Sequence, residues 1–232
     1  MLRNSLRRLL SWSGRLLLSL RYRVEVRGME EIRARGTSRV LFLPSHLALI
    51  DPAILTVVLD RWFPTRALGD EYQISRPVIG WLARLYGVRA LPNMERSGLS
   101  VMDATRQALA ETIEGLRAGE NLLFYPSGRL RQQSLEEIRA ASGADILVKA
   151  VPEARVVLVR QTGLWGSSFS LAFDGKMPNA VASAWRGVKY LLLNGLFFMP
   201  RRDVLIELVE PDDFPRNEGR MVINRYLETG VW

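Results

Sequence analysis

The sequence has no cysteine and only one histidine among its 232 residues. Without cysteine the chain can form no disulfide bond and offers no thiolate nucleophile. A single histidine and no thiolate also leave too few of the ligands that zinc sites use, so we expect no metal site. No apolar run reaches the roughly 20 residues that a membrane-spanning helix needs. These absences argue against a disulfide-stabilised protein, a zinc enzyme and a polytopic membrane protein.

Acidic residues are fewer than basic ones, with 24 Asp and Glu against 32 Lys and Arg and a net charge of +8. This excess favours anionic partners such as phosphate esters, acidic lipid headgroups or nucleic acid. The sequence has no zinc-finger spacing, no aromatic RNA-binding strand and no long basic run, so we do not expect nucleic acid as a partner. Phosphorylated small molecules and membrane surfaces therefore remain as the expected anionic partners.

The first 21 residues combine leucines with arginines in a pattern typical of an amphipathic helix. The arginines argue against a membrane span, and the segment lacks the apolar core and cleavage site of a secretory signal. Such a helix either lies in the plane of a membrane surface or packs on its own domain. We predict a membrane-associating helix over residues 1–21 and a single domain over residues 22–232.

A second apolar stretch covers residues 190–199, with Lys189 before it and Arg201 and Arg202 after it. It is too short to span a bilayer. It forms either a buried helix or an apolar patch that enters the lipid surface between flanking cations. Together with the amphipathic N-terminus, it suggests a peripheral membrane protein.

Strand-like and helix-like segments alternate along the chain. This alternation predicts an α/β fold in which helices cover both faces of a mainly parallel central sheet. The expected strands are residues 22–27, 39–43, 65–69, 88–91, 121–125, 156–160 and 204–209, and the expected helices are residues 53–62, 78–86, 99–117 and 218–228.

The single histidine, His46, closely follows the apolar run of residues 40–43. Asp51 and Pro52 are typical of a helix start, with Asp51 as the N-cap and Pro52 as the first helical residue. Open α/β sheets place their chemistry in loops at the carboxyl ends of strands. A histidine titrates near neutral pH, and a nearby carboxylate can fix its tautomer and orientation. The spacing predicts a His46–Asp51 pair as base and orienting group; the alternative is an ordinary helix cap with no chemical role.

A second block, residues 124–131, joins another apolar strand to a turn rich in Pro, Ser and Gly. Gly128 permits close backbone approach to a ligand, and turn amides beside Arg129 form a candidate phosphate-binding site. By itself this string is also an ordinary turn. Because it ends a strand of the same sheet, we expect it to face His46.

The His46-x4-Asp51 block followed by Phe-Tyr-Pro-Ser-Gly128-Arg129 resembles the glycerophospholipid acyltransferase family, over roughly residues 20–228. The likeness is strongest to one branch of this family. It is carried by the ungapped Pro-Ser-Gly128-Arg129 turn, by residues 163–170 and by residues 197–202. That branch is the acyltransferase portion of bifunctional 2-acylglycerophosphoethanolamine acyltransferase/acyl-ACP synthetases. The resemblance makes residues 22–232 an acyltransferase domain.

The resemblance implies transfer of a fatty acyl group from acyl-CoA or acyl-ACP to a hydroxyl of a lysophospholipid or glycerol-phosphate acceptor. His46 would be the general base and Asp51 its orienting group. Residues that would bind the acceptor phosphate are Ser127, Gly128, Arg129 and Arg96. The resemblance further implies that no cofactor or metal is needed, that the protein works at the cytoplasmic face of the membrane, and that an adenylate-forming acyl ligase is a candidate fused domain or partner. The alternative is a catalytically impaired, acyltransferase-like lipid-binding protein.

Three positions depart from the family pattern. Ser127 stands where the family has glutamate, which leaves the acceptor preference open. The arginine of the second family block corresponds to Arg89 or Arg96, neither in clean register, and Arg96 is the preferred choice. Leu158 replaces a structural proline of the fourth block.

Overall fold

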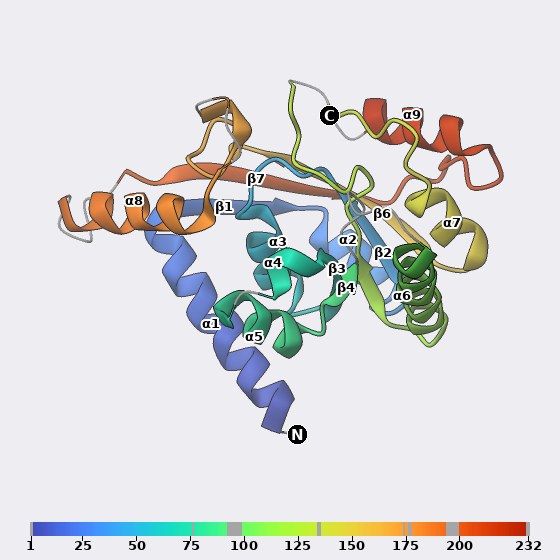
Figure 1. Ribbon diagram of the computed structural model, residues 1–232, viewed down its shortest axis with the longest axis horizontal. Coiled ribbons are helices and arrows are strands. Elements are labelled where there is room, and N and C mark those ends of the chain that lie inside the picture. The colour runs from blue at the N-terminus through green and yellow to red at the C-terminus, as the bar shows by residue number, and fades with distance from the viewer. Residues whose placement is uncertain are drawn as a thin grey trace.

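The computed structural model describes residues 2–75, 77–91, 99–133, 136–173, 175, 178–193 and 200–230. Within this part of the chain, the strands form a seven-stranded sheet with the order β1-β7-β6-β2-β5-β3-β4 (Figure 1). The strands are β1 (Tyr22–Arg27), β2 (Val40–Pro44), β3 (Thr65–Asp70), β4 (Arg89–Leu91), β5 (Asn121–Leu123), β6 (Arg155–Thr162) and β7 (Arg202–Val209). The helices are α1 (Leu2–Arg21), α2 (Met29–Ala34), α3 (Asp51–Leu59), α4 (Glu71–Ile74), α5 (Pro77–Tyr86), α6 (Leu99–Arg117), α7 (Gly143–Ala150), α8 (Ala180–Leu193) and α9 (Arg220–Gly230).

The sheet is mainly parallel, as predicted. Strand β2 lies between β5 and β6 and runs parallel to both. Strand β1 is parallel to β7, and β3 is parallel to β4 and β5. The exception is β7, which pairs antiparallel with β6. The central position of β2 places the carboxyl end of this strand, and the loop that carries His46, in the middle of the sheet.

Helices cover both faces of the sheet, and β2 shows how the sequence produces two cores. All five residues of β2 are buried. Val40 and Phe42 belong to a core that includes α3, whereas Leu41 and Leu43 belong to a second core with α7 and α9. Because side chains alternate across a strand, a continuous apolar run is what two covered faces require. The predicted α/β architecture is therefore confirmed (Figure 1).

Most element boundaries lie within a few residues of those predicted. Strand β5 ends at Leu123, so Tyr125 falls in the following turn instead of the strand. The short helices α2 and α4 were not predicted. Helix α8 takes up the beginning of the second apolar stretch, and residues 194–199 of that stretch lie outside the described residues.

Helix α1 packs on the domain through its polar side. Arg7 Nε lies 2.5 Å from Asp60 Oδ1, and Ser11 Oγ donates to Asp60 Oδ2 at 2.6 Å. Arg15 Nη2 donates to the carbonyl oxygen of Val57 at 2.9 Å. The opposite side of the helix exposes the large apolar side chains Leu6, Leu9, Trp12, Leu16 and Leu17. Packing on the domain thus uses the polar side of α1, together with Leu18 against the core, and leaves these apolar side chains exposed.

No helix in the described part of the chain combines the length and apolar character needed to cross a bilayer.

Candidate active site

His46 lies just beyond the carboxyl end of the central strand β2. Gln161 of the neighbouring strand β6 donates its side-chain amide to the carbonyl oxygen of Ser45 at 3.1 Å. This hydrogen bond fixes the backbone immediately before His46. The histidine therefore occupies the position at which open α/β sheets carry ligands and chemistry.

The imidazole of His46 contacts the carboxylate of Asp51. Nδ1 lies 3.1 Å from Oδ1 and 3.2 Å from Oδ2. Asp51 is fully buried, and its Oδ2 also accepts hydrogen bonds from the backbone N–H groups of Leu47 at 2.7 Å and Ala48 at 3.1 Å. One carboxylate therefore closes the loop between the two residues and holds the imidazole.

The prediction that Asp51 is the N-cap of α3 is wrong by one position. Ile50 is the N-cap and makes no side-chain hydrogen bond, and Asp51 is the first residue of the helix. A capping carboxylate bonds the N–H groups of its own helix. The Asp51 carboxylate instead bonds the N–H groups of the preceding loop, where it also meets His46.

The contact with Asp51 determines the tautomer of His46. A carboxylate only accepts hydrogen bonds, so Nδ1 carries the proton of this contact and Nε2 of the neutral ring keeps a lone pair. Burial by itself lowers the pKa of His46, whereas the charge and hydrogen bond of Asp51 and the charge of Glu136 raise it. The sum raises the pKa above its ordinary value of 6.5. Nε2 is therefore a stronger base than in an isolated histidine.

Tyr125 completes the surroundings of Asp51 and was not identified from the sequence. Its hydroxyl donates to Asp51 Oδ1 at 3.0 Å, and its ring centroid lies 4.6 Å from that of His46. Burial, followed by the charge and hydrogen bond of Asp51, raises the pKa of Tyr125 well above 10, so the phenol remains a donor. The only sequence signal was an aromatic residue at the start of the second block.

The second block faces the first, as expected. The backbone N–H of Arg131 donates to the carbonyl oxygen of His46 at 2.7 Å. Gly128 adopts a φ of 63°, a conformation that glycine adopts without strain. Its N–H donates to the carbonyl oxygen of Tyr125 at 3.1 Å. The amide of Gly128 therefore closes the turn.

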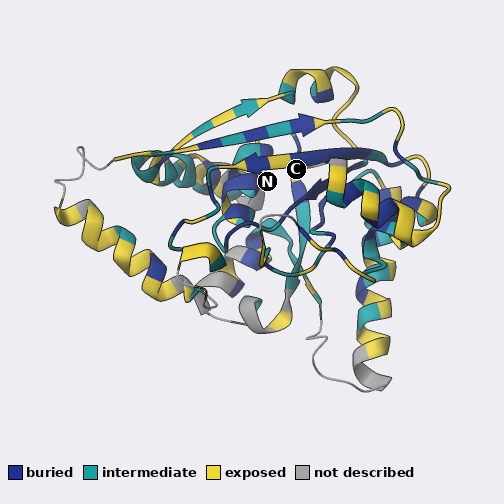
Figure 2. Ribbon diagram, turned by 90° about the horizontal axis from the view of Figure 1, so that it is seen from above, coloured by how far each residue is buried: buried dark blue, intermediate teal, exposed yellow. Residues whose placement is uncertain are grey.

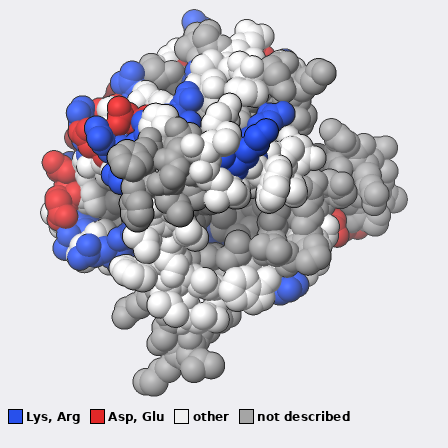
Figure 3. All heavy atoms as spheres, turned by 90° about the vertical axis from the view of Figure 1, so that its left-hand side faces the viewer, with Lys and Arg blue, Asp and Glu red and all other residues white. Residues whose placement is uncertain are grey.

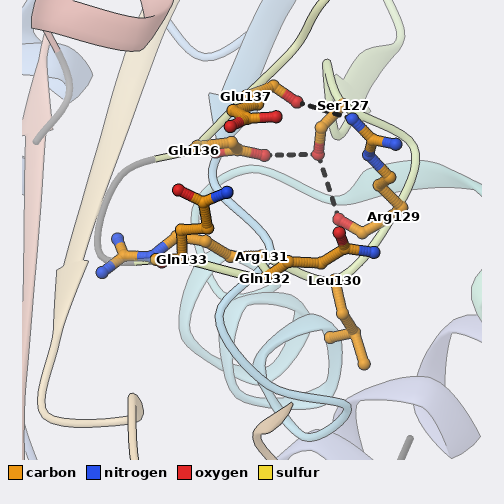
Figure 4. Close-up of a pocket in the computed structure, with 8 residues that line it drawn as sticks. All are labelled: Ser127, Arg129, Leu130, Arg131, Gln132, Gln133, Glu136 and Glu137. Atoms are coloured by element: carbon orange, nitrogen blue, oxygen red, sulfur yellow. Dashed lines mark hydrogen bonds between the residues drawn. The ribbon is translucent and has the colours of Figure 1, made fainter. Parts of the chain in front are cut away.

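A small pocket opens beside this turn (Figure 4). It is lined by Ser127, Arg129, Leu130, Arg131, Gln132, Gln133, Glu136 and Glu137. Arg129 Nη2 donates to the carbonyl oxygen of Glu137 at 3.2 Å, and the Arg131 guanidinium lies 4.7 Å from the centroid of the Trp165 ring. The pocket thus combines two arginines, which suit an anionic group, with the two acidic residues Glu136 and Glu137.

Ser127 does not act alone. Its hydroxyl lies within hydrogen-bond distance of Glu136 Oε1, and 3.0 Å from the carbonyl oxygen of Arg129. Glu136 is a buried residue that was not identified from the sequence, because it lies nine positions after Ser127 and belongs to no recognisable motif. The turn itself carries serine and no glutamate. The Ser127 hydroxyl nevertheless contacts a carboxyl group, that of Glu136, beside the turn.

The sequence offered Arg89 or Arg96 as the arginine of the second family block, and the structure describes only Arg89. Arg96 lies outside the described residues. Arg89, on β4, directs Nη2 to Glu120 Oε2 at 3.0 Å, and Glu120 Oε1 accepts from Arg66 at 2.6 Å. Arg89 is thus part of an ion-pair cluster between strands. Within the described residues, no group of three or more His, Asp or Glu side chains is placed to hold a metal ion.

Among solved structures, the chain resembles the crystal structure of the 1-acyl-sn-glycerophosphate (LPA) acyltransferase PlsC from Thermotoga maritima. The TM-score is 0.63 and the sequence identity 18%, over 99% of this chain and 78% of that one. At this identity the likeness shows a shared fold. A search of curated proteins found no match.

A protein-family model with the description Acyltransferase matches residues 23–161. This range is more than half of the chain, and it includes both the His46–Asp51 pair and the turn that carries Ser127 and Arg129. The residues that form the candidate site are therefore the ones that the family model spans, and the chain belongs to the Acyltransferase family.

Proposed function

We propose that the protein transfers a fatty acyl group from a thioester, acyl-CoA or acyl-ACP, to a hydroxyl of a lysophospholipid or glycerol-phosphate acceptor. The observation that carries this proposal is the contact of His46 Nδ1 with the buried carboxylate of Asp51, at 3.1 Å, beside an arginine-bearing pocket. Family membership supports the reaction class, and the pocket supports a phosphorylated acceptor.

In the proposed reaction, Nε2 of His46 removes the proton of the acceptor hydroxyl as the oxygen attacks the thioester carbonyl carbon. The new C–O bond forms, the C–S bond breaks, and the proton moves from His46 to the departing thiolate. Asp51 stabilises the imidazolium that exists between these two transfers. Because the acceptor supplies the nucleophile, no acyl-enzyme intermediate is required.

The surroundings of Asp51 favour this role because they prevent the carboxylate from turning away. Two backbone N–H groups and the Tyr125 hydroxyl bind it in addition to His46. A general base that is already oriented spends no energy on reorganisation during the reaction. Tyr125 is a positioning residue in this scheme.

Arg129 would bind the acceptor phosphate in the pocket beside His46, together with Arg131. Ser127 would act through its contact with Glu136, and Gly128 through the shape of the turn. Arg96 stays a proposed phosphate-binding residue. The donor, acyl-CoA or acyl-ACP, stays open, and the resemblance of residues 163–170 to the bifunctional branch supports an adenylate-forming acyl ligase as a fused domain or partner.

Acyl transfer should be observed directly. Radiolabelled palmitoyl-CoA and palmitoyl-ACP, each incubated with the protein and a panel of lysophospholipids and glycerol 3-phosphate, should place label in an acylated product. The control omits the acceptor and measures thioester hydrolysis. If no acceptor takes up label while the protein still binds lipid vesicles, the proposal fails and the lipid-binding alternative takes its place.

We also propose that the protein acts at a membrane surface, where both acyl chains are found. Helices α1 and α8 lie in the same part of the molecule, and α8 extends beyond the edge of the sheet (Figure 1). Helix α8 is exposed over most of its surface (Figure 2). Its exposed apolar side chains are Val181, Trp185, Val188, Tyr190, Leu192 and Leu193.

The distribution of charge on this side of the molecule suits a lipid surface. Among the described residues on the face in Figure 3, Lys and Arg side chains lie among uncharged atoms, and acidic side chains lie mainly toward the margin. Interfacial helices bury their apolar side in the lipid while basic residues meet anionic headgroups. The exposed apolar side of α1 fits the same arrangement.

Replacing Leu16, Leu17 and Trp185 with serine should weaken membrane binding by about a hundredfold or more, because each large apolar side chain contributes about 1.5–3 kcal/mol when fully buried. These side chains are 56%, 66% and 69% exposed, so their loss should leave the fold intact. Binding is measured by co-flotation with vesicles of phosphatidylcholine and phosphatidylglycerol.

The matched control is the Met221→Ser, Val222→Ser variant, which removes exposed apolar side chains from α9. It should bind vesicles as the wild type does. Substitution is preferable to deletion of α1, because deletion would leave the buried Asp60 without Arg7 and Ser11. Equal flotation of both variants would contradict the assignment of this face.

A further inference from the structure

Ser183 is a point at which helix α8 is fixed to the domain. Among the described side chains of α8, only Ser183 is buried, with 1% exposed, while the rest of the helix surface is open to solvent (Figure 2). Its hydroxyl donates to the backbone carbonyl oxygen of Ser168 at 2.6 Å. A buried hydroxyl needs such a partner, so this hydrogen bond stabilises the position of α8 against the domain.

A second contact joins α8 to the same part of the chain. The Arg186 guanidinium lies 5.4 Å from the centroid of the Phe173 ring. Phe173 ends a short 3₁₀ helix that begins at Leu171, three residues after Ser168. Both contacts of α8 therefore reach residues 163–173, which we call the bridging segment.

The bridging segment also contacts the loop between His46 and Asp51. The backbone N–H of Leu49, within this loop, donates to the carbonyl oxygen of Phe169 at 2.9 Å. Ser168 accepts from α8 and Phe169 accepts from the loop, so the two acceptors are consecutive carbonyl groups of one backbone. Helix α8 and the His46–Asp51 loop are therefore joined through neighbouring residues.

The second block is in contact with the bridging segment as well. The ring of Trp165 lies 4.7 Å from the guanidinium of Arg131, which lines the pocket beside the turn (Figure 4). The Trp165 carbonyl oxygen accepts from Arg202 Nη2, on β7, at 2.7 Å. One end of the bridging segment is thus fixed to the sheet, and the segment touches both blocks of the candidate site.

Hydrogen bonds within the bridging segment make it a connected unit. The fully buried Ser170 accepts at its Oγ from the backbone N–H groups of Gly166, at 3.3 Å, and Ala172, at 3.2 Å. These bonds join the residues on either side of Ser168 and Phe169. A displacement of the segment at α8 should therefore reach the carbonyl that holds the His46–Asp51 loop.

A lipid surface offers α8 the cover that the domain does not provide. Its exposed large apolar side chains include Trp185, Leu192 and Leu193. Their burial in lipid is favourable, so a membrane favours the position of α8 that buries them. A ligand shifts a conformational equilibrium by its difference in affinity for the two states, and here the lipid surface is that ligand.

We propose that Ser183 is a positioning residue that couples the membrane contact of α8 to the His46–Asp51 loop. Membrane-bound α8 holds the bridging segment through Ser183, and the segment holds the loop through the Phe169 carbonyl. The protein is then more active at a lipid surface than in water, even toward a water-soluble acceptor. This inference rests on the proposed acyl transfer and membrane binding, and it adds a regulation of the same site.

The test uses water-soluble substrates, so that vesicles act on the protein and not on the supply of substrate. These are hexanoyl-CoA with glycerol 3-phosphate or hexanoyl lysophosphatidic acid. Vesicles of phosphatidylcholine and phosphatidylglycerol should raise kcat of the wild type about fivefold or more, the lower end of the usual coupling between two sites. Ser183→Ala should bind vesicles as the wild type does, because its exposed apolar side chains are intact. Its kcat values with and without vesicles should lie within about twofold of each other.

Two further variants guard against a purely structural effect. Thr112→Val removes a buried hydroxyl that donates to the carbonyl oxygen of Ala108 at 2.7 Å within α6, so it should lower Tm as Ser183→Ala does but keep the full stimulation. Arg186→Met changes an exposed residue and removes the contact with Phe173. It should fold and should lower the stimulation about twofold or more, the value of an exposed cation–π contact.

Three results would overturn the proposal. One is a wild type that vesicles do not stimulate. Another is a loss of kcat in Ser183→Ala that is equally large with and without vesicles, since this would show a structural role. The third is a Ser183→Ala protein that folds but no longer floats with vesicles, since Ser183 would then act on binding.

Hydrogen exchange separates this inference from the proposed reaction. The exchange rate of the Leu49 N–H reports its bond to Phe169 and needs no turnover. Vesicles should slow this exchange about threefold to tenfold in the wild type, as expected for the strengthening of one hydrogen bond, and leave it unchanged in Ser183→Ala. Slower exchange confined to the wild type supports the coupling even if no acceptor is acylated. An unchanged rate in the wild type overturns the coupling even if acyl transfer is found.

Discussion

His46→Ala should lower the rate of acyl transfer by about 10²–10⁴-fold, the usual contribution of a positioned general base. Without the imidazole, the acceptor hydroxyl must lose its proton to water, and the thiolate must leave without a proton donor. The measurement is kcat for label transfer from palmitoyl-CoA or palmitoyl-ACP to the best acceptor of the wild type. Turnover close to that of the wild type would exclude His46 as the base.

The variant should nevertheless fold. Asp51 keeps the N–H groups of Leu47 and Ala48 and the hydroxyl of Tyr125 as donors, so its buried carboxylate is not left without partners. The His46 side chain is 17% exposed, and its loss removes mainly the ring contact with Tyr125. A cost of about 1 kcal/mol lowers Tm by roughly 2–4 °C for a domain of this size. A Tm measurement on the assayed sample separates lost chemistry from lost structure.

The sequence predicted the fold well because the decisive signals are local. The five buried residues of β2 form a continuous apolar run, and such a run requires cover on both faces of a sheet. Helix α6 shows its apolar periodicity and ends before Gly119, which has a positive φ of 94°. The antiparallel pairing of β6 with β7 has no comparable signal, because it depends on the path of the chain between two distant strands.

The site was predicted only where its residues are close in the sequence. His46 and Asp51 belong to one loop, and their contact follows from its short span. Tyr125 reaches Asp51 from a separation of 74 residues, so the sheet must form before the two can meet. Glu136 reaches the site through a loop whose course no periodicity reveals. The orientation of α1 could not be predicted either. Its polar side contacts a buried residue, Asp60, at the end of α3, which is distant in the sequence.

Asp51→Asn should reduce acyl transfer by about 10²–10⁴-fold and move the acid limb of the pH profile to lower pH. His46 must be neutral to act as a base, and Asp51 raises its pKa above 6.5, so wild-type activity should fall as the pH drops through that raised value. Removing the Asp51 charge leaves burial, which lowers the pKa of His46, as the main influence. The asparagine amide can also donate toward Nδ1, which places the proton on Nε2 and removes the base. The measurement is kcat/KM from about pH 5 to pH 9, a range that spans the titration of histidine.

Asp60→Asn provides the control for this shift, since Asp60 is also a buried carboxyl beside α3 but holds Arg7 and Ser11 of α1. It should lower Tm without moving the acid limb, because it has no contact with His46. An acid limb that stays in place in Asp51→Asn would show that the carboxylate supports the loop but does not control His46. An acid limb that moves to higher pH in Asp51→Asn would contradict the inference that Asp51 raises the pKa of His46. Only a downward shift confined to Asp51→Asn identifies this carboxylate as the group that stabilises the imidazolium.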